Sequence, residues 1–125
     1  MDVTLRGALL VAAGAAVGGV ARYVVTSALP HDFPFGTLAV NILGSFLLAL
    51  LAFGPLGSLD LRLLFGVGAL GAFTTMSTFA LDTVSLVEGA SWQLAVANAF
   101  LNPGICLLSA VLGRVVGSWW THLGV

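Results

Sequence analysis

The chain has 125 residues, of which 59% are hydrophobic and only 7% carry a charge. Soluble domains carry about 25% charged residues, and a chain this short exposes too much surface to hide so many apolar side chains in one core. We therefore expect its surroundings to be a lipid bilayer. A net charge of −1 and the absence of lysine argue against a nucleic-acid partner.

The few charged residues divide the chain into four apolar stretches, each long enough for the roughly 20 residues that cross a bilayer as a helix. Helices are expected because lipid offers no partners to free backbone groups. The sequence therefore predicts an all-α membrane protein with one four-span domain over residues 1–125. The expected spans are about 6–29, 34–56, 62–82 and 90–117.

The first stretch contains a close-packing motif and an isolated charge. Gly14 and Gly18 form a GxxxG pattern, which lets helix backbones approach closely. The start, MDVTLR, carries an acid and a base, so we expect a retained first span and not a cleaved signal peptide. Because four short helices leave little interior for a pathway, we expect an oligomer, most simply a dimer.

The distribution of arginines gives only a weak membrane orientation. Arg22 falls on one side of the expected bundle, and the other three arginines fall near the opposite side. These three are Arg6, Arg62 and Arg114. So thin a positive-inside bias is compatible with insertion in both orientations, or with a simple scarcity of charge.

Neutral hydrogen-bonding side chains recur at helical spacing in the second and fourth stretches. Thr37, Asn41 and Ser45 share one face, since they are four residues apart. A similar face carries Asn98, Asn102 and Ser109. One interpretation is interhelical hydrogen bonding, worth about 0.6 kcal/mol per bond in a membrane. The other is a polar pathway, because the amide of asparagine is not satisfied by its own helix.

The third stretch contains GALGAFTTMSTFALD, residues 68–82, which combines glycines with a cluster of hydroxyl residues at its centre. These are poor helix formers, so we expect a break between Gly71 and Thr74. Freed carbonyl oxygens there would suit a small hard cation. After the break, Met76 and Phe79 share a face, where an aromatic ring edge can meet an anion or simply pack.

Two further expectations concern the later part of the chain. Pro103 should bend or break the fourth helix near its middle, because proline removes a backbone donor. Asp82 and Glu88 are expected to flank the loop after the third span as interfacial residues. No acid would then lie at the centre of a span, which disfavours a proton-coupled carrier. The sequence also lacks a catalytic motif, so we do not expect an enzyme.

Three segments together resemble the Fluc fluoride channels, also called the CrcB family. They are GGVARY at 18–23, GTLAVNILGSF at 36–46 and GALGAFTTMSTF at 68–79, and their order and spacing cover nearly the whole chain. The resemblance implies a passive fluoride-selective channel in the cell (inner or plasma) membrane that exports cytoplasmic fluoride and relieves its toxicity. It also implies an antiparallel, dual-topology dimer with two pores and a central structural sodium ion.

The resemblance assigns roles to individual residues by their motif positions. The carbonyls of Gly71 and Thr74 would hold sodium, and Arg22 would lie at a vestibule or interface. Asn41 would be the pore asparagine. With the asparagines of the fourth span added, the expected anion pathway consists of Thr37, Asn41, Met76, Phe79, Asn98, Asn102 and Ser109.

The chain departs from the family pattern at two places. Met76 stands where the family has the first of two phenylalanines, and Asn98 and Asn102 replace the usual hydroxyl pattern of the fourth span. A homodimer is the first expectation, and one subunit of a heteromeric channel with a paralogous partner is the second. Outside the family, the sequence is also compatible with a small four-span carrier or with a non-transporting membrane scaffold.

Overall fold

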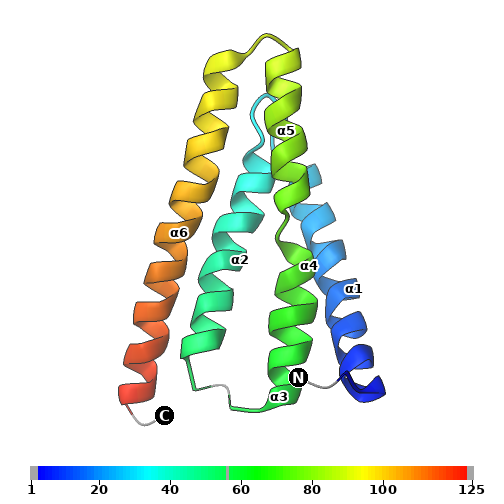
Figure 1. Ribbon diagram of the computed structural model, residues 1–125, viewed down its shortest axis with the longest axis vertical. Coiled ribbons are helices and arrows are strands. Elements are labelled where there is room, and N and C mark those ends of the chain that lie inside the picture. Colours follow the sequence, from blue (N-terminus) through cyan, green and yellow to red (C-terminus); the bar gives the residue numbers. More distant parts are fainter. Residues whose placement is uncertain (1–2, 56, 124–125) are drawn as a thin grey trace.

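The computed structural model describes residues 3–55 and 57–123 and contains four long apolar helices, the third of them interrupted (Figure 1). In chain order the elements are α1 (Leu5–Ala28), α2 (Phe35–Phe53), α3 (Leu59–Leu61), the π-helix η1 (Arg62–Leu70), α4 (Gly71–Phe73), α5 (Met76–Glu88) and α6 (Trp92–His122). The α3 to α5 elements together form the third long helix, Leu59–Glu88. Each of the four is long and apolar enough to cross a membrane.

The helix ends are set by short polar side chains and by residues that leave the helical conformation. Thr4, Ser58 and Thr75 each accept a backbone N–H from the first turn of the helix that follows, as N-caps do. Between α1 and α2, residues 29–34 include two prolines and form the connection. After α5, Ala90 adopts a positive φ of 57°, which reverses the chain into α6.

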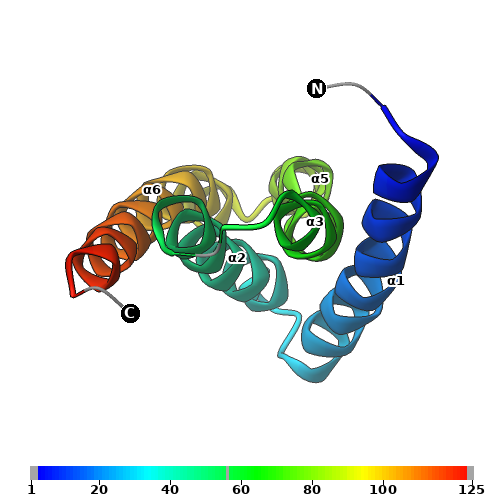
Figure 2. The same ribbon diagram turned by 90° about the horizontal axis from the view of Figure 1, so that it is seen from below.

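The third long helix lies between α1 on one side and the α2–α6 pair on the other (Figure 2). Close packing between the helices depends on glycine. A methyl group on Gly14 or Gly18 would overlap the carbonyl oxygens of Leu64 and Ala69 in η1. Between α6 and α2, a methyl group on Gly113 would likewise overlap the carbonyl oxygen of Phe46. Backbone-to-backbone packing of this kind is typical of helices in membranes.

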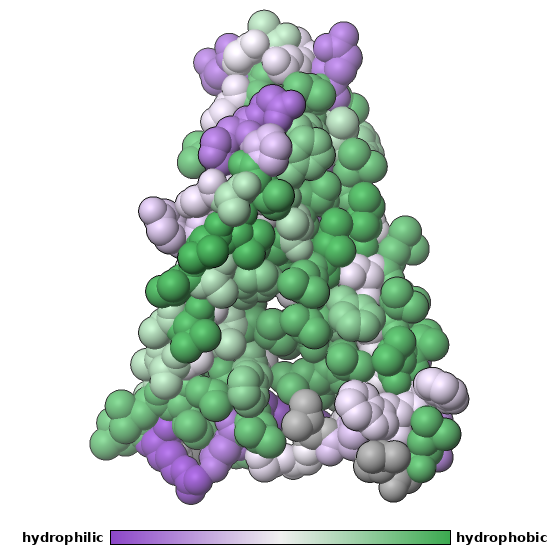
Figure 3. Space-filling view, turned by 180° about the vertical axis from the view of Figure 1, so that it is seen from behind, coloured by the Kyte–Doolittle hydropathy of each residue, from purple (hydrophilic) through white to green (hydrophobic). Residues whose placement is uncertain are grey.

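The outer surface matches a bilayer environment. Apolar residues cover the middle of the face seen in Figure 3, while polar residues gather at its two ends. Most of the large apolar side chains outside the small core are exposed, among them Val17, Phe100 and Leu108. Lipid would cover such side chains in a membrane. The few buried apolar side chains would not be enough to stabilise the fold in water through the hydrophobic effect.

The interruption of the third helix is at Thr74 and Thr75, at the edge of the segment predicted to break. Both residues are extended, with φ and ψ of −82° and 157° for Thr74 and of −153° and 117° for Thr75. The fourth helix, in contrast, is not broken: α6 continues as an α-helix through Pro103. Pro103 was expected to bend or break this helix, and the break does not occur, because the 31-residue helix continues on both sides of the missing N–H.

Candidate functional site

The two residues of the break are held by an asparagine from a neighbouring helix. The backbone N–H of Thr75 donates to Oδ1 of Asn41 at 2.7 Å, and Nδ2 of Asn41 donates to the Thr75 carbonyl at 3.0 Å. Asn41 lies on α2 and is 9% exposed. Its amide thus replaces the helical partners that Thr75 loses, which explains how the backbone can leave the helix at membrane depth.

The same asparagine also orients a second one. Nδ2 of Asn41 donates to Oδ1 of Asn102 on α6 at 3.2 Å, and the thiol of Cys106 donates weakly to the same oxygen at 3.7 Å. Asn102 is 3% exposed, and its Nδ2 has no partner among the described residues. Hydrogen bonds through the amides of Asn41 and Asn102 therefore link the break to α2 and α6.

On the other side of the break, Arg22 of α1 approaches the same segment. Its Nη1 donates to the carbonyl of Thr74 at 3.3 Å, and the side chain is half-buried. The extended conformation of Thr74 turns this carbonyl away from the helical ladder. Arg22 therefore places a positive charge at the carbonyl that the sequence predicted as a sodium ligand.

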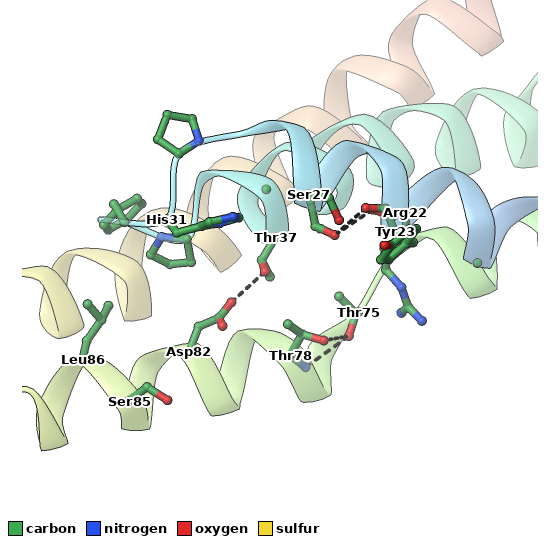
Figure 4. A pocket seen from close by; sticks show the side chains of 16 residues that line it. Arg22, Tyr23, Ser27, His31, Thr37, Thr75, Thr78, Asp82, Ser85 and Leu86 are labelled. Carbon is green, nitrogen blue, oxygen red and sulfur yellow. Dashed lines mark hydrogen bonds between the residues drawn. The ribbon is translucent and has the colours of Figure 1, made fainter.

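A polar cavity of about 790 Å³ opens between α1, α2 and α5 (Figure 4). Hydroxyl groups line it from the break outward: Thr75 caps α5, and its Oγ1 donates to Oγ1 of Thr78 at 2.9 Å. Further along α5, Asp82 accepts a hydrogen bond of 2.6 Å from Oγ1 of Thr37 on α2. Arg22 and His31 also line this cavity, which we call the polar cavity.

A second, smaller cavity of about 250 Å³ lies beside the break, between α2, α5 and α6. We call it the inner cavity. Its wall carries no charged residue and contains Asn41, Gly44, Ser45, Leu48, Thr74, Thr75, Met76, Phe79, Asn102, Pro103 and Cys106. Thr75 belongs to the walls of both cavities, so the clamp of Asn41 on Thr75 is where the two cavities adjoin.

The structure does not bring all predicted pathway residues to these cavities. Thr37 lines the polar cavity, whereas Asn41, Met76, Phe79 and Asn102 line the inner one. Asn98 is fully buried and donates to Oγ1 of Thr83 at 2.9 Å, linking α6 to α5. Ser109 donates to the carbonyl of Ile42 at 2.8 Å, linking α6 to α2. These two residues make interhelical hydrogen bonds, as the first interpretation of the polar faces predicts.

Asp82 was expected at the end of the third span, but the helix continues six residues beyond it, to Glu88. An acid therefore lies within the third long helix. The signal was present in the spacing, because Thr75, Thr78 and Asp82 follow each other at helical intervals and share one face. That face now lines the polar cavity.

The backbone at the break has the chemistry that a small hard cation requires. In an unbroken helix the Thr75 N–H would donate to the Gly71 carbonyl, but here it donates to Asn41. The Gly71 carbonyl therefore loses that donor, and the Thr74 carbonyl points out of the helix. Side chains offer no substitute: the described residues contain no cluster of three His, Cys, Asp or Glu that could hold a metal. Carbonyl oxygens are suitable ligands for such a cation.

The Thr37–Asp82 bond gives a first testable prediction. Thr37 is 4% exposed, and valine has the same shape without the hydroxyl. We expect Thr37→Val to lower the free energy of unfolding by about 2 kcal/mol, because a hydrogen bond to a charged group is lost. The measurement is the thermal unfolding of the purified protein in detergent. Asp82→Asn, which keeps an acceptor, is the control and should lower the free energy of unfolding by less. If Thr37→Val unfolds at the same temperature as the parent protein, this bond does not stabilise the fold.

Comparison with known proteins shows the family of the chain. Residues 9–114 match the family described as CrcB-like protein, Camphor Resistance (CrcB). The chain belongs to the CrcB family. A relative from Alteromonas mediterranea is 50% identical over 111 residues, which cover 82% of this chain and 87% of the relative. One from Magnetococcus marinus is 48% identical over 115 residues, covering 86% and 94%.

A third relative, from Shewanella frigidimarina, is 41% identical over 117 residues, covering 88% of this chain and 94% of the relative. All three carry the name Fluoride-specific ion channel FluC. The resemblance recognised in the sequence is thus confirmed, and the relatives are named as an ion channel and not as an enzyme. CrcB membership and the four apolar helices make the chain a multi-pass membrane protein.

Proposed function

We propose that the chain is a passive fluoride-selective channel of the cell membrane that exports cytoplasmic fluoride and so relieves its toxicity. The observation that carries this proposal is the identity of up to 50% over most of the chain with relatives named as fluoride-specific channels. The site supports it: neutral donors line a cavity without charged residues, beside a second cavity that carries Arg22.

The chemistry of the cavities suits a small, strongly hydrated anion. Such an ion must exchange its water for other donors, and conduction requires sites that are numerous and weak. Hydroxyl and amide groups meet both requirements, whereas buried cations would hold the ion too tightly. We propose that the ion passes Thr37 in the polar cavity and then Asn41, Met76, Phe79 and Asn102 in the inner one. Asn98 and Ser109 support the walls of this pathway.

We infer that the functional unit is an antiparallel dimer inserted in both orientations. The weak arginine bias permits this, and the exposed apolar faces of the single chain leave surface for a second copy. At the two-fold axis, the carbonyls of Gly71 and Thr74 from both copies would together hold a structural sodium ion. When bound, this ion would neutralise carbonyl dipoles that face each other across the interface. Arg22 donates to the carbonyl of Thr74, so the sodium ion would take the remaining lone pair of that oxygen.

The test is fluoride efflux from liposomes that contain this purified chain alone, measured with a fluoride electrode. Fast efflux of fluoride, with chloride efflux close to that of empty liposomes, is the expected result. Folded and dimeric protein that releases no fluoride would overturn a homomeric channel. Recovery of efflux on adding a paralogous subunit would then identify a heteromeric channel.

Restoring the aromatic ring of the family at position 76 should increase transport. Met76 is 73% exposed in the single chain and lines the inner cavity, so a larger ring can be accommodated. A thioether lacks the positive ring edge that a phenylalanine presents to an anion. We expect Met76→Phe to raise fluoride efflux by about threefold, and Met76→Leu, which adds no ring, to leave it unchanged or lower. Equal efflux from the phenylalanine and leucine variants would contradict this role of position 76.

Removal of sodium should destabilise the assembly. When sodium in the buffer is replaced by N-methyl-D-glucamine, we expect the dimer to unfold at a lower temperature. A ligand present at 100 times its dissociation constant contributes about 2.7 kcal/mol, and this contribution is lost when the ligand is removed. Thermal unfolding in detergent at matched ionic strength measures the change, and addition of sodium should reverse it. A midpoint that is independent of sodium would contradict a structural sodium ion.

A further inference from the structure

We propose that Asn102, and not Asn41, supplies the amide N–H groups that bind the permeating anion in the inner cavity, and that Asn41 is the residue that positions Asn102. The proposal rests on the proposed function, because it names the group that meets the anion along that pathway. It differs from the role that family resemblance assigns to Asn41. The hydrogen bonds around the break carry the argument.

Asn41 has no donor to spare. An asparagine amide has two N–H groups and one carbonyl oxygen. One N–H of Asn41 donates to the Thr75 carbonyl at 3.0 Å, and the other donates to Oδ1 of Asn102 at 3.2 Å. Its oxygen accepts the Thr75 N–H at 2.7 Å. For Asn41 to bind an anion, it would have to release the break or release Asn102.

Asn102 is in the opposite state. Its oxygen accepts from two donors, Nδ2 of Asn41 and Sγ of Cys106, while its two N–H groups have no partner among the described residues. The side chain is 3% exposed, and a buried donor without a partner costs about 1–3 kcal/mol. A ligand that accepts hydrogen bonds would recover this energy.

The orientation of the Asn102 amide is fixed by its neighbours. The Thr75 N–H can only donate, so the atom of Asn41 that faces it must be the oxygen. The other end of Asn41 must then be the nitrogen, and the atom of Asn102 that faces this nitrogen must be an oxygen. Rotating the Asn102 amide by half a turn would place two N–H groups against each other. The broken backbone at Thr75 therefore determines that Asn102 keeps its donors free.

The surroundings of Asn102 favour an anion that is bound weakly. Asn102 belongs to the wall of the inner cavity, which carries no charged residue and also contains the ring of Phe79 and the thiol of Cys106. A neutral amide offers an anion two N–H groups without a full positive charge. A site of this strength can replace part of the lost hydration and still release the ion.

The test compares Asn102→Ser with Asn102→Ala in liposomes that contain the full chain. Both substitutions remove the whole amide group. The serine hydroxyl can donate to an anion and can also accept from Asn41, so the half-saturating fluoride concentration, and not efflux alone, separates anion binding from positioning. Only serine keeps a hydrogen-bond donor. We expect efflux through the serine variant within about threefold of the parent protein, and at least roughly tenfold slower efflux through the alanine variant. The half-saturating fluoride concentration should rise in the alanine variant, which a purely structural role would not produce.

Each outcome has a distinct meaning. Equal efflux and equal half-saturation for the serine and alanine variants, with an active parent protein, would overturn the inference and leave the fluoride channel intact. A parent protein that releases no fluoride would overturn the proposed function itself. If either variant fails to form a stable dimer, Asn102→Thr and Asn102→Val give the same comparison with matched shapes. If fluoride efflux through the valine variant is faster than through the threonine variant, the inference is likewise overturned.

Discussion

Replacement of Gly18 by alanine is expected to lower the free energy of unfolding by about 3 kcal/mol or more and to abolish fluoride transport. The added methyl group would overlap the carbonyl oxygen of Ala69 in η1, and its other near neighbours there are backbone atoms of the same residue. A flexible side chain could turn aside, but backbone cannot, so α1 must separate from η1. Thermal unfolding in detergent and size-exclusion chromatography measure the loss.

Gly19 provides the matched control, because it is the next residue and a methyl group there meets nothing within 4 Å. Gly19→Ala should have normal stability and normal efflux, with a small gain in helix propensity. If Gly18→Ala and Gly19→Ala unfold at the same temperature, the close contact between α1 and η1 does not hold the fold together.

Asn41→Leu is expected to produce the second large effect, a loss of fluoride efflux by roughly a hundredfold together with reduced stability. Leucine has a similar size but cannot bond to Thr75, whose N–H and carbonyl are then left without these partners in a buried position. Each unsatisfied buried group costs about 1–3 kcal/mol. The Asn102 oxygen loses a donor as well, so its free N–H groups lose their fixed direction.

The dimer should persist in Asn41→Leu, because Asn41 lies on α2 and makes its contacts within the chain. Efflux and dimer content are therefore measured on the same sample, and Ser109→Ala serves as a control that removes one interhelical bond from α6. Normal efflux from Asn41→Leu would show that the clamp on the break is unnecessary for transport. Efflux lost equally in Ser109→Ala would show that the pathway responds to any lost bond between α2 and α6.

The number of helices and the weak point of the third could be predicted because both depend on local properties. The length of an apolar segment determines whether it can cross a bilayer. The glycine, serine and threonine residues between positions 68 and 82 are poor helix formers in any context. The family membership followed from the same residues. Of the bend or break expected at Pro103, the break does not occur, because one missing N–H is insufficient to end a long helix that packs closely against α2.

The site was less predictable because it depends on which helix faces which. Helical spacing placed Thr37 and Asn41 on one face, yet it could not show that Asp82 accepts from the first and that Thr75 is held by the second. Likewise, Asn98 and Asn102 lie one turn apart on α6, but one contacts α5 and the other α2. Periodicity gives the face of a residue, and only the packing of the bundle gives its partner.

The glycine contacts show which parts of the bundle have no freedom to shift. Where backbone touches backbone, no side-chain rotamer can absorb a movement, so Gly14 and Gly18 hold α1 to η1, Gly113 holds α6 to α2, and Gly36 holds the start of α2 to the end of α1. The extended residues Thr74 and Thr75 are instead held through side chains, because Arg22 and Asn41 reach them from opposite sides. A substitution of either side chain would therefore release the break while the surrounding helices keep their places.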